Sequence, residues 1–203
     1  MRILKRLSRV MELPWAYALW QAPFLNAKFA PILEHNDIGS VRRVLDVGCG
    51  PGTNTRFFAH ADYVGLDINP AYIERARRKY RRTFLQADVC DYRPSVHQHY
   101  DFVLLNSLLH HLDDANTHRI LGVVRDVLVA AGCVHIVDLI LPESRGIARY
   151  LTQNDRGDYP RRWEAWQELL SRHFEPVVQQ PFSVGIGAIE LWRMLYFKGR
   201  PKR

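Results

Sequence analysis

Four short apolar runs in the middle of the chain constrain its fold more than any other feature. They lie at residues 43–47, 63–67, 102–105 and 134–137 and are rich in aliphatic and β-branched residues. Runs of this kind, bounded by Gly, Asp or Asn, are typical of strands buried on both faces. Stretches with helical spacing at 70–80 and 113–132 separate them, and a weaker strand is expected at 83–86. Strands that alternate with helices predict a parallel sheet covered on both faces.

The pattern changes after Pro142. We expect a polar, irregular, lid-like insertion at about 142–160, then a helix at 161–173 and two strands near 177–179 and 191–197. A length of 203 residues allows one domain with a short cap. We therefore assign residues 1–40 to an N-terminal helical cap and residues 41–203 to an α/β core.

A glycine-rich loop follows the first predicted strand, with Gly48, Gly50 and Gly52 at every second position. Glycines at such a turn permit positive φ angles and let a ligand lie directly on the backbone. The loop is not the dinucleotide fingerprint, because Thr53 stands where that motif needs its third glycine, and it lacks the Gly-Lys-Ser/Thr of a phosphate-binding P-loop. The alternative is a tight strand-to-helix turn without a ligand.

Acidic residues follow the next two strands at the same predicted edge of the sheet. Asp67, about 17–20 residues beyond the glycines, can accept both hydroxyl hydrogens of a ribose. Asp88 can accept a hydrogen bond from the exocyclic amine of an adenine while Val89 packs on the ring. The alternatives are a helix cap at Asp67 and a simple turn at Asp88.

With all four strand ends considered, the sequence resembles the class I S-adenosylmethionine-dependent methyltransferases over residues 40–140, and the last two strands fit loosely. The matching residues are Asp46-x-Gly48-x-Gly50-x-Gly52, Asp67, Asp88, Asp101-Phe102-Val103, His110-His111-Leu112 and Gly132. The resemblance implies a seven-stranded, mostly parallel Rossmann-like sheet of order 3-2-1-4-5-7-6, with strand 7 antiparallel. It also implies an enzyme that uses S-adenosylmethionine and releases S-adenosylhomocysteine.

The resemblance assigns roles to the strand ends. The glycine loop would contact the methionine part of the cofactor, and Asp46 would organise that loop and meet the ammonium group. The residues after the second and third strands would hold the ribose and the adenine, and those after the fourth would line the pocket near the sulfonium. The implied cofactor-binding residues are Asp46, Gly48, Cys49, Gly50, Gly52, Asp67, Ile68, Asp88, Val89, Asn106 and Ser107. Cys49 is interpreted as a packing residue rather than a nucleophile.

His110 and His111 are the candidate catalytic residues. An unperturbed histidine titrates near pH ~6.5 and can serve as a general base when an acceptor must lose a proton. The alternative is a loop histidine that only makes local hydrogen bonds. No zinc-type spacing of Cys or His occurs, so no metal is expected.

The net charge of +7 suggests nucleic acid or a membrane surface, but much of it lies at the two ends. Residues 1–9 and 198–203 each carry four basic residues and no acid. The apolar stripe of residues 1–11 allows a peripheral membrane contact as well as a cap helix or dimer contact. The basic cluster at 75–82 can follow phosphates or form a solvated helix face. Three separated cysteines and the lack of a signal peptide indicate a cytoplasmic protein, either a monomer or a homodimer.

The acceptor pocket is expected to use the aromatic residues outside the core, with Tyr17, Trp20 and Arg149 as candidate contacts. Aromatic-rich walls suit a small, aromatic or partly apolar acceptor. The residues after the fourth strand, Asn106-Ser107-Leu108-Leu109, lack the Pro-Pro-aromatic sequence usual in methyltransferases of nucleic-acid bases. A small-molecule methyltransferase is therefore the main hypothesis. An RNA or other nucleic-acid methyltransferase and a non-catalytic cofactor-binding scaffold are the alternatives.

Overall fold

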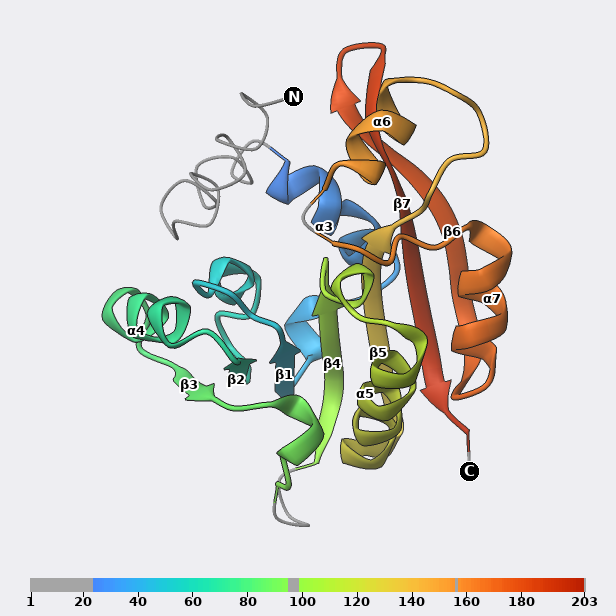
Figure 1. Ribbon diagram of the computed structural model, residues 1–203. Coiled ribbons are helices and arrows are strands. Elements are labelled where there is room, and N and C mark those ends of the chain that lie inside the picture. The colour runs from blue at the N-terminus through green and yellow to red at the C-terminus, as the bar shows by residue number, and fades with distance from the viewer. Residues whose placement is uncertain (1–23, 95–98, 156, 203) are drawn as a thin grey trace.

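Seven strands form one sheet in the computed structural model, which describes residues 24–94, 99–155 and 157–202 (Figure 1). The strand order is β3-β2-β1-β4-β5-β7-β6, with β1 to β5 parallel and β7 antiparallel to both of its neighbours. The predicted order and the antiparallel strand 7 are confirmed. The strands are β1 (Arg43–Val47), β2 (Asp62–Asp67), β3 (Thr83–Gln86), β4 (Tyr100–Asn106), β5 (Leu128–Leu139), β6 (Phe174–Ile186) and β7 (Ile189–Pro201).

Helices cover both faces of the sheet, as the fully buried strands require. The α-helices are α3 (Leu25–Glu34), α4 (Pro70–Lys79), α5 (Asp114–Val127), α6 (Ile147–Gln153) and α7 (Trp163–Ser171). Short 3₁₀ turns are η1 (Ile38–Ser40), η2 (Thr53–Phe57), η3 (Val89–Asp91) and η4 (Leu109–His111). Residues 1–23, with most of the predicted cap, lie outside the described residues; α3 and η1 occupy its remaining part.

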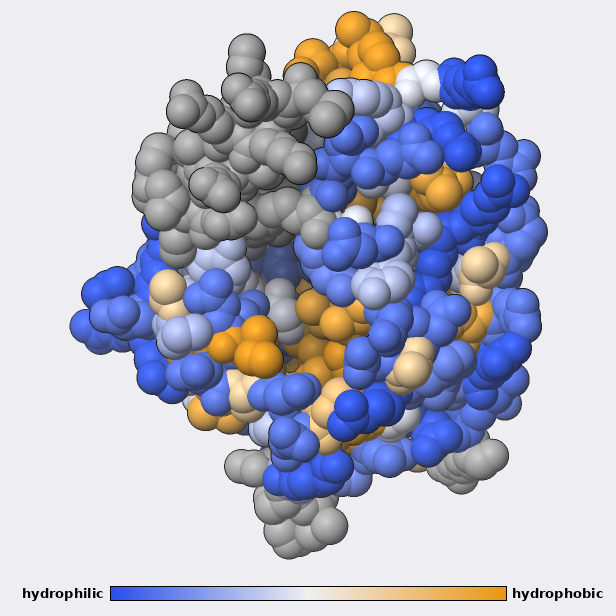
Figure 2. Space-filling model, viewed as in Figure 1, coloured by the Kyte–Doolittle hydropathy of each residue, from blue (hydrophilic) through white to orange (hydrophobic). Residues whose placement is uncertain are grey.

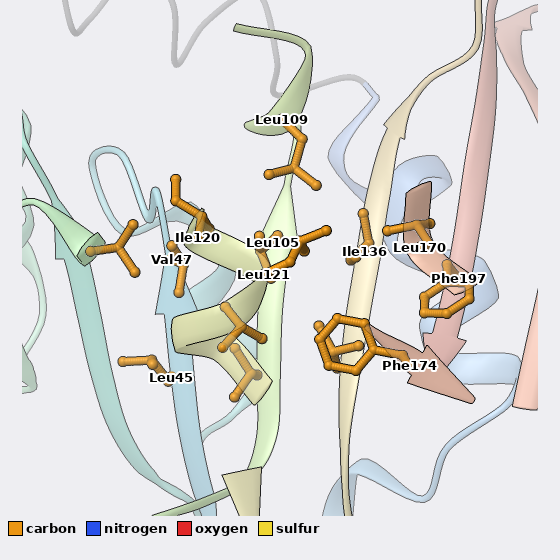
Figure 3. Packing of buried hydrophobic residues seen from close by; sticks show 14 of the residues in the cluster. Leu45, Val47, Leu105, Leu109, Ile120, Leu121, Ile136, Leu170, Phe174 and Phe197 are labelled. Atoms are coloured by element: carbon orange, nitrogen blue, oxygen red, sulfur yellow. The ribbon is translucent and has the colours of Figure 1, made fainter. Parts of the chain in front are cut away.

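Alternate residues of the central strands pack against opposite helix layers. Leu45, Val47 and Leu105 face α5 and α7, where Ile120, Leu121 and Leu170 meet them (Figure 3). Their neighbours Val44 and Leu104 face α3 and α4 on the other side. Successive side chains of a strand point to opposite faces of the sheet. A polar residue at a strand end therefore lies on the side that its position in this alternation gives it.

Several predicted boundaries differ from the structure. The helix predicted to end near Gly132 ends at Val127. Residues 128–132, which were assigned to this helix, form the start of β5 instead. The lid-like insertion at 142–160 is not wholly irregular, because it contains α6. Its described residues after α6, 154–155 and 157–160, have no helix or strand. The glycine loop leads into the short turn η2. Within the described ranges, no helix is long and apolar enough to cross a membrane.

The two edges of the sheet differ in length. β3 pairs with β2 over four residues, whereas β6 pairs with β7 along almost all of its length and carries Pro176 and Pro181. The hairpin between β6 and β7 extends beyond the rest of the sheet (Figure 1). Its tip exposes Ile186 and Ile189.

Arg161 joins the insertion to the core. Its side chain is buried and donates to the carbonyl oxygens of Leu109 at 3.0 Å and Leu112 at 2.7 Å. It also pairs with Asp114, and its guanidinium lies 5.0 Å from the centre of the Trp166 ring. One planar cation with five donors therefore fixes η4, the start of α5 and α7 relative to one another.

We expect Arg161→Met to lower the free energy of unfolding by about 3 kcal/mol or more, because it leaves buried carbonyl oxygens without donors. The matched control is Arg172→Met: Arg172 is 60% exposed and pairs with Glu168 one helical turn away. That change should cost about 0.5 kcal/mol or less. Urea denaturation followed by circular dichroism measures both, and a similar loss in the two variants would contradict the role given to Arg161.

Candidate functional site

The predicted cofactor residues meet at the carboxyl ends of β1, β2 and β4. Gly48, Gly50 and Gly52 have φ angles of 69°, 54° and 79°, so each adopts a left-handed conformation that favours glycine. A Cβ atom added at Gly50 would meet no protein atom within 4 Å, so the loop faces open space at that point. Figure 2 shows a hollow in this face of the molecule, with hydrophobic side chains on its walls.

Asp67 closes the loop onto the end of β2. Its Oδ2 accepts a hydrogen bond from the Gly50 backbone N–H at 2.8 Å, and its Oδ1 accepts one from the Asn69 N–H at 2.8 Å. Burial raises the pKa of Asp67, although these two backbone donors act against the shift. The carboxylate is held by the backbone, and each oxygen keeps a further lone pair for a ligand hydroxyl.

Asp46 begins a chain of polar side chains on the α3 and α4 face. The carboxylate is fully buried and accepts hydrogen bonds from Tyr63 Oη at 2.5 Å and from Asn54 Nδ2 at 3.1 Å. The Oδ1 atom of Asp46 has no hydrogen-bond partner among the described residues. Asn106 Nδ2 donates to Asn54 Oδ1 at 3.2 Å, which carries the chain from β1 to the end of β4. Burial raises the pKa of Asp46 to about 7.

The three predicted adenine contacts, Ile68, Asp88 and Val89, lie in different surroundings. Asp88 Oδ1 accepts a hydrogen bond from the Cys90 N–H at 2.8 Å, so this carboxylate also caps η3. Val89 is buried in the core on the α5 side, whereas Ile68 is 69% exposed beside Asp67. Cys49 is buried and packs against the α3 and α4 face, and burial raises the pKa of its thiol.

Ser107 turns the chain sharply after β4. It is the one non-glycine residue with a positive φ, 57°, in the part of the chain that the structure describes. Its backbone N–H donates to the Val137 carbonyl oxygen at 2.7 Å, and its Oγ donates to Asn106 Oδ1 at 3.2 Å. The buried Lys28 of α3 donates from Nζ to Ser107 Oγ at 3.2 Å. Lys28 was not among the predicted site residues.

His110 lies on the opposite face of the sheet edge, against a second carboxylate. Asp138, near the end of β5, is fully buried and accepts hydrogen bonds from His110 Nδ1 at 2.6 Å and from the Leu109 N–H at 2.8 Å. It also accepts one from the Leu139 N–H at 2.7 Å. Sequence reasoning missed Asp138, although an acid inside an apolar strand is itself a signal of a buried partner.

The charges of this pair support each other. Burial by itself would lower the pKa of His110, but the charge and hydrogen bond of Asp138 outweigh it, so the net pKa is raised. Burial would raise the pKa of Asp138, but His110 and the two backbone donors outweigh it, so the net pKa is lowered. Each partner of the pair therefore favours the charged form of the other.

A segment of the insertion covers His110. The Nε2 atom of His110 lies 3.6 Å from Asp155 Oδ2, and a Cβ atom added at Gly157 would lie 2.2 Å from His110 Cδ2. The Tyr159 N–H donates to the His110 carbonyl oxygen at 3.0 Å. His110 is consequently 3% exposed, whereas its neighbour His111 is exposed.

Of the three predicted acceptor contacts, the structure describes Arg149. Tyr17 and Trp20 lie outside the described residues. Arg149 Nη1 donates to the Pro142 carbonyl oxygen, so its guanidinium braces the start of the insertion. Trp166 is buried in the core and donates to the Leu139 carbonyl oxygen at 2.9 Å. Of the three predicted contacts, Arg149 therefore has a structural partner, and Tyr17 and Trp20 stay predictions.

The basic cluster at 75–82 also has internal partners. Arg77 donates to the Phe84 carbonyl oxygen at 2.7 Å, and Arg82 donates to the Ala61 carbonyl oxygen at 3.2 Å. Arg78 pairs with Glu74 at 2.7 Å. Across the described residues, no three His, Cys, Asp or Glu side chains form a potential metal site.

Asp138→Asn should lower the free energy of unfolding at pH 7 by about 3–5 kcal/mol, because it removes the buried negative charge that His110 and two backbone N–H groups surround. In the wild type, the raised pKa of His110 gives stabilisation that is complete below pH 6.5 and is lost as the pH rises through that raised pKa. The lowered pKa of Asp138 gives stabilisation that is present above pH 3.8 and is lost as the pH falls.

Denaturation from pH 3 to pH 9 tests this pair, with Asp126→Asn as the control. Asp126 is 68% exposed and pairs with its neighbour Arg125. The wild type and the control should show both pH-dependent losses, and Asp138→Asn should show neither. An unchanged pH profile in Asp138→Asn would contradict the assignment.

Sequence relatives can now be set beside this geometry. Residues 44–132 match the model of a methyltransferase domain family. The trans-aconitate 2-methyltransferase of Methylobacterium radiotolerans is 33% identical over 175 residues, covering 82% of this chain and 66% of that protein. The protein of the same name from Yersinia pestis is 35% identical over 88 residues, covering 41% of this chain and 33% of that protein. The matched region thus spans only part of these relatives' length.

Solved structures show the same fold. The Burkholderia thailandensis 1,6-didemethyltoxoflavin-N1-methyltransferase, with bound 1,6-didemethyltoxoflavin and S-adenosylhomocysteine, aligns with a TM-score of 0.71 at 20% identity. The alignment covers 100% of this chain and 89% of that chain. The sequence match gives the family and the strand order gives the fold class: the chain belongs to the class I S-adenosylmethionine-dependent methyltransferases.

Proposed function

We propose that this protein transfers the methyl group of S-adenosylmethionine to a small acceptor molecule. The observation that carries the proposal is the Asp67 carboxylate, fixed by the Gly50 and Asn69 N–H groups beside a left-handed glycine loop that faces open space. A backbone loop that a ligand can approach, followed by an acid positioned for ribose hydroxyls, fits an adenosine-containing cofactor.

The other strand ends would complete the cofactor site. The glycine loop would hold the methionine part, and the unpartnered Asp46 Oδ1 offers an acceptor for its ammonium group. Asp88 and Ile68 would flank the adenine. Asn106 and Ser107 would stand near the sulfonium, at the end of the polar chain that starts at Asp46.

The cofactor, when bound, supplies a methyl group on a positively charged sulfur, which is already reactive towards nucleophiles. The chain therefore has to align the acceptor with the methyl group and exclude water. Asp155, Gly157 and Tyr159, which lie against His110, are placed to do so from the side of β5. Exposed Tyr150 and Tyr159 lie in this region and suit an aromatic or partly apolar acceptor.

His110 is better suited to position the loop than to remove a proton. Its Nδ1 is hydrogen-bonded to Asp138, its Nε2 faces Asp155, and its pKa is raised. The ring is also only 3% exposed, so it is not open to an acceptor molecule. The exposed His111 would serve as the base if the acceptor must lose a proton.

Two observations favour a small acceptor over RNA. Arg77, Arg78 and Arg82 of the basic cluster have partners within the chain. The relatives named above carry small-molecule acceptors, trans-aconitate and 1,6-didemethyltoxoflavin, in their names.

Asp67→Ala should weaken the binding of S-adenosylhomocysteine by about 100-fold, because two charge-assisted hydrogen bonds to the ribose would be lost. The control is Asp62→Ala, which removes an exposed acid from the other end of the same strand. Isothermal titration calorimetry measures both variants. Failure of the wild type to bind S-adenosylhomocysteine would sink the proposal, and binding without turnover on a broad acceptor panel would support a non-catalytic scaffold.

The affinity for S-adenosylmethionine should rise about tenfold from pH 6 to pH 8. Burial, opposed by hydrogen bonds from Tyr63 and Asn54, sets the pKa of Asp46 near 7, and Asp67 raises it further through its charge. A bound cation favours the ionised carboxylate, so binding should release a proton from Asp46. Calorimetry in buffers of different ionisation enthalpy detects that proton. Asp46→Asn should flatten the pH dependence, and an unchanged slope in this variant would refute the linkage.

A further inference from the structure

A cavity open to solvent lies between α4 and the edge strand β3. Its volume is about 410 Å³, and three arginines form part of its wall: Arg77, Arg81 and Arg82. α4 packs beside β3 at this edge of the sheet (Figure 1), and Arg77 links the two elements through the Phe84 carbonyl oxygen. A concave space of this size accommodates a small ligand, and the chemistry of the wall decides which kind.

Backbone carbonyl oxygens hold two of these guanidinium groups in place. Arg77 donates to the Phe84 carbonyl oxygen from Nε at 3.0 Å and from Nη2 at 2.7 Å. Arg82 donates from Nη1 to the Ala61 carbonyl oxygen at 3.2 Å and from Nη2 to the Ala59 carbonyl oxygen. A guanidinium has five N–H donors, so Arg77 keeps three for another acceptor. Because carbonyl oxygens are uncharged, both side chains are oriented without losing their positive charge.

The positive charge of the wall is not balanced by neighbouring acids. In the part of the chain that the structure describes, none of the ion pairs involves Arg77, Arg81 or Arg82. The described wall contains a single acid, Asp62 at the start of β2. Three cations against one carboxylate give the cavity a positive potential, which favours an anionic ligand.

The carboxyl end of α4 explains only part of this charge. The unsatisfied carbonyl groups at a helix end amount to about half a negative charge, which attracts basic residues. Arg78 in the last turn is balanced by Glu74 at 2.7 Å. Arg81 and Arg82 follow the helix, which ends at Lys79. The helix end therefore does not account for their place on the cavity wall.

The cavity lies at the opposite end of β2 from the cofactor residues. Asp62 begins this strand and Asp67 ends it. Since a strand rises about 3.3 Å per residue, about 16 Å of strand separate the two. A ligand in the cavity would therefore neither overlap with the ribose position nor take part in methyl transfer.

We propose that this cavity is a second binding site, which takes a phosphate group, either free or as a phosphomonoester. Several guanidinium groups can donate to the oxygens of one phosphate, and its charge offsets more of the wall than a single carboxylate would. The exposed Thr83 adds a hydroxyl donor to the wall. The cavity has the volume of one small ligand, whereas nucleic acid would need phosphate contacts along several nucleotides. The inference does not depend on the proposed methyl transfer.

Nuclear magnetic resonance titration of the isotope-labelled, full-length protein tests this site. Inorganic phosphate and ribose 5-phosphate, added at constant ionic strength, should shift the Nε–H signals of Arg77, Arg81 and Arg82 with one common, saturable dissociation constant. Tighter binding of ribose 5-phosphate would identify a phosphomonoester as the ligand, and equal binding would identify the phosphate group alone. Arg81→Met should weaken binding about tenfold, because it removes a charged donor. Asp62→Asn should strengthen binding about threefold, because it removes the acid from the wall.

Arg78→Met is the matched control. It removes the same charge from α4, but Arg78 is 69% exposed, pairs with Glu74 and is not part of the described cavity wall. This variant should bind phosphate like the wild type. Arg81→Met should change the affinity for S-adenosylhomocysteine less than threefold, which separates the cavity from the cofactor site.

Two results would overturn the proposal directly: phosphate shifts that do not saturate, and an equal loss of affinity in Arg78→Met and Arg81→Met. A single-stranded RNA that displaces phosphate at lower concentration than ribose 5-phosphate does would also overturn it. That outcome would assign the arginines to a nucleic-acid surface rather than to a site for a small phosphate ligand.

Discussion

The ion pair between Asp138 and His110 fixes the part of the chain on which the site depends. One buried carboxylate receives an imidazole and two backbone N–H groups, so the turn after β4 cannot move independently of β5. The same turn carries the carbonyl oxygens of Leu109 and Leu112, and both accept hydrogen bonds from Arg161. The insertion, η4 and the start of α5 are therefore arranged around a single negative charge.

Two buried carboxyl groups at the same sheet edge have pKa values shifted in opposite directions. Asp138 faces the α5 and α7 layer, and His110 with two N–H groups lowers its pKa. Asp46 faces the α3 and α4 layer, where neutral Tyr63 and Asn54 do not offset burial and the pKa rises to about 7. The first group gives rigidity, whereas the second is suited to respond to a bound cation.

The sheet could be predicted from the sequence, because buried strands and the helices between them leave characteristic apolar patterns. The glycine loop and the acids at the strand ends could be predicted as well, because each lies next to such a strand in the sequence. The partners of those residues were not predictable in the same way. Asp138 contacts His110 only after β4 and β5 pair. Tyr17 and Trp20 lie outside the described residues and stay predictions. Lys28 did leave a signal: it shares the i, i+3, i+4 stripe of Leu25, Phe29 and Ile32, where a charge stands out.

The edges of the sheet limit how copies of the chain can associate. Proline in an edge strand directs its missing N–H towards solvent, and β6 has this gap at Pro176 and Pro181. The other edge, β3, offers only four residues. A strand from a second molecule would meet an interrupted row of donors on β6 and a row of only four residues on β3. Both edges therefore work against the growth of one continuous sheet across two copies of the chain.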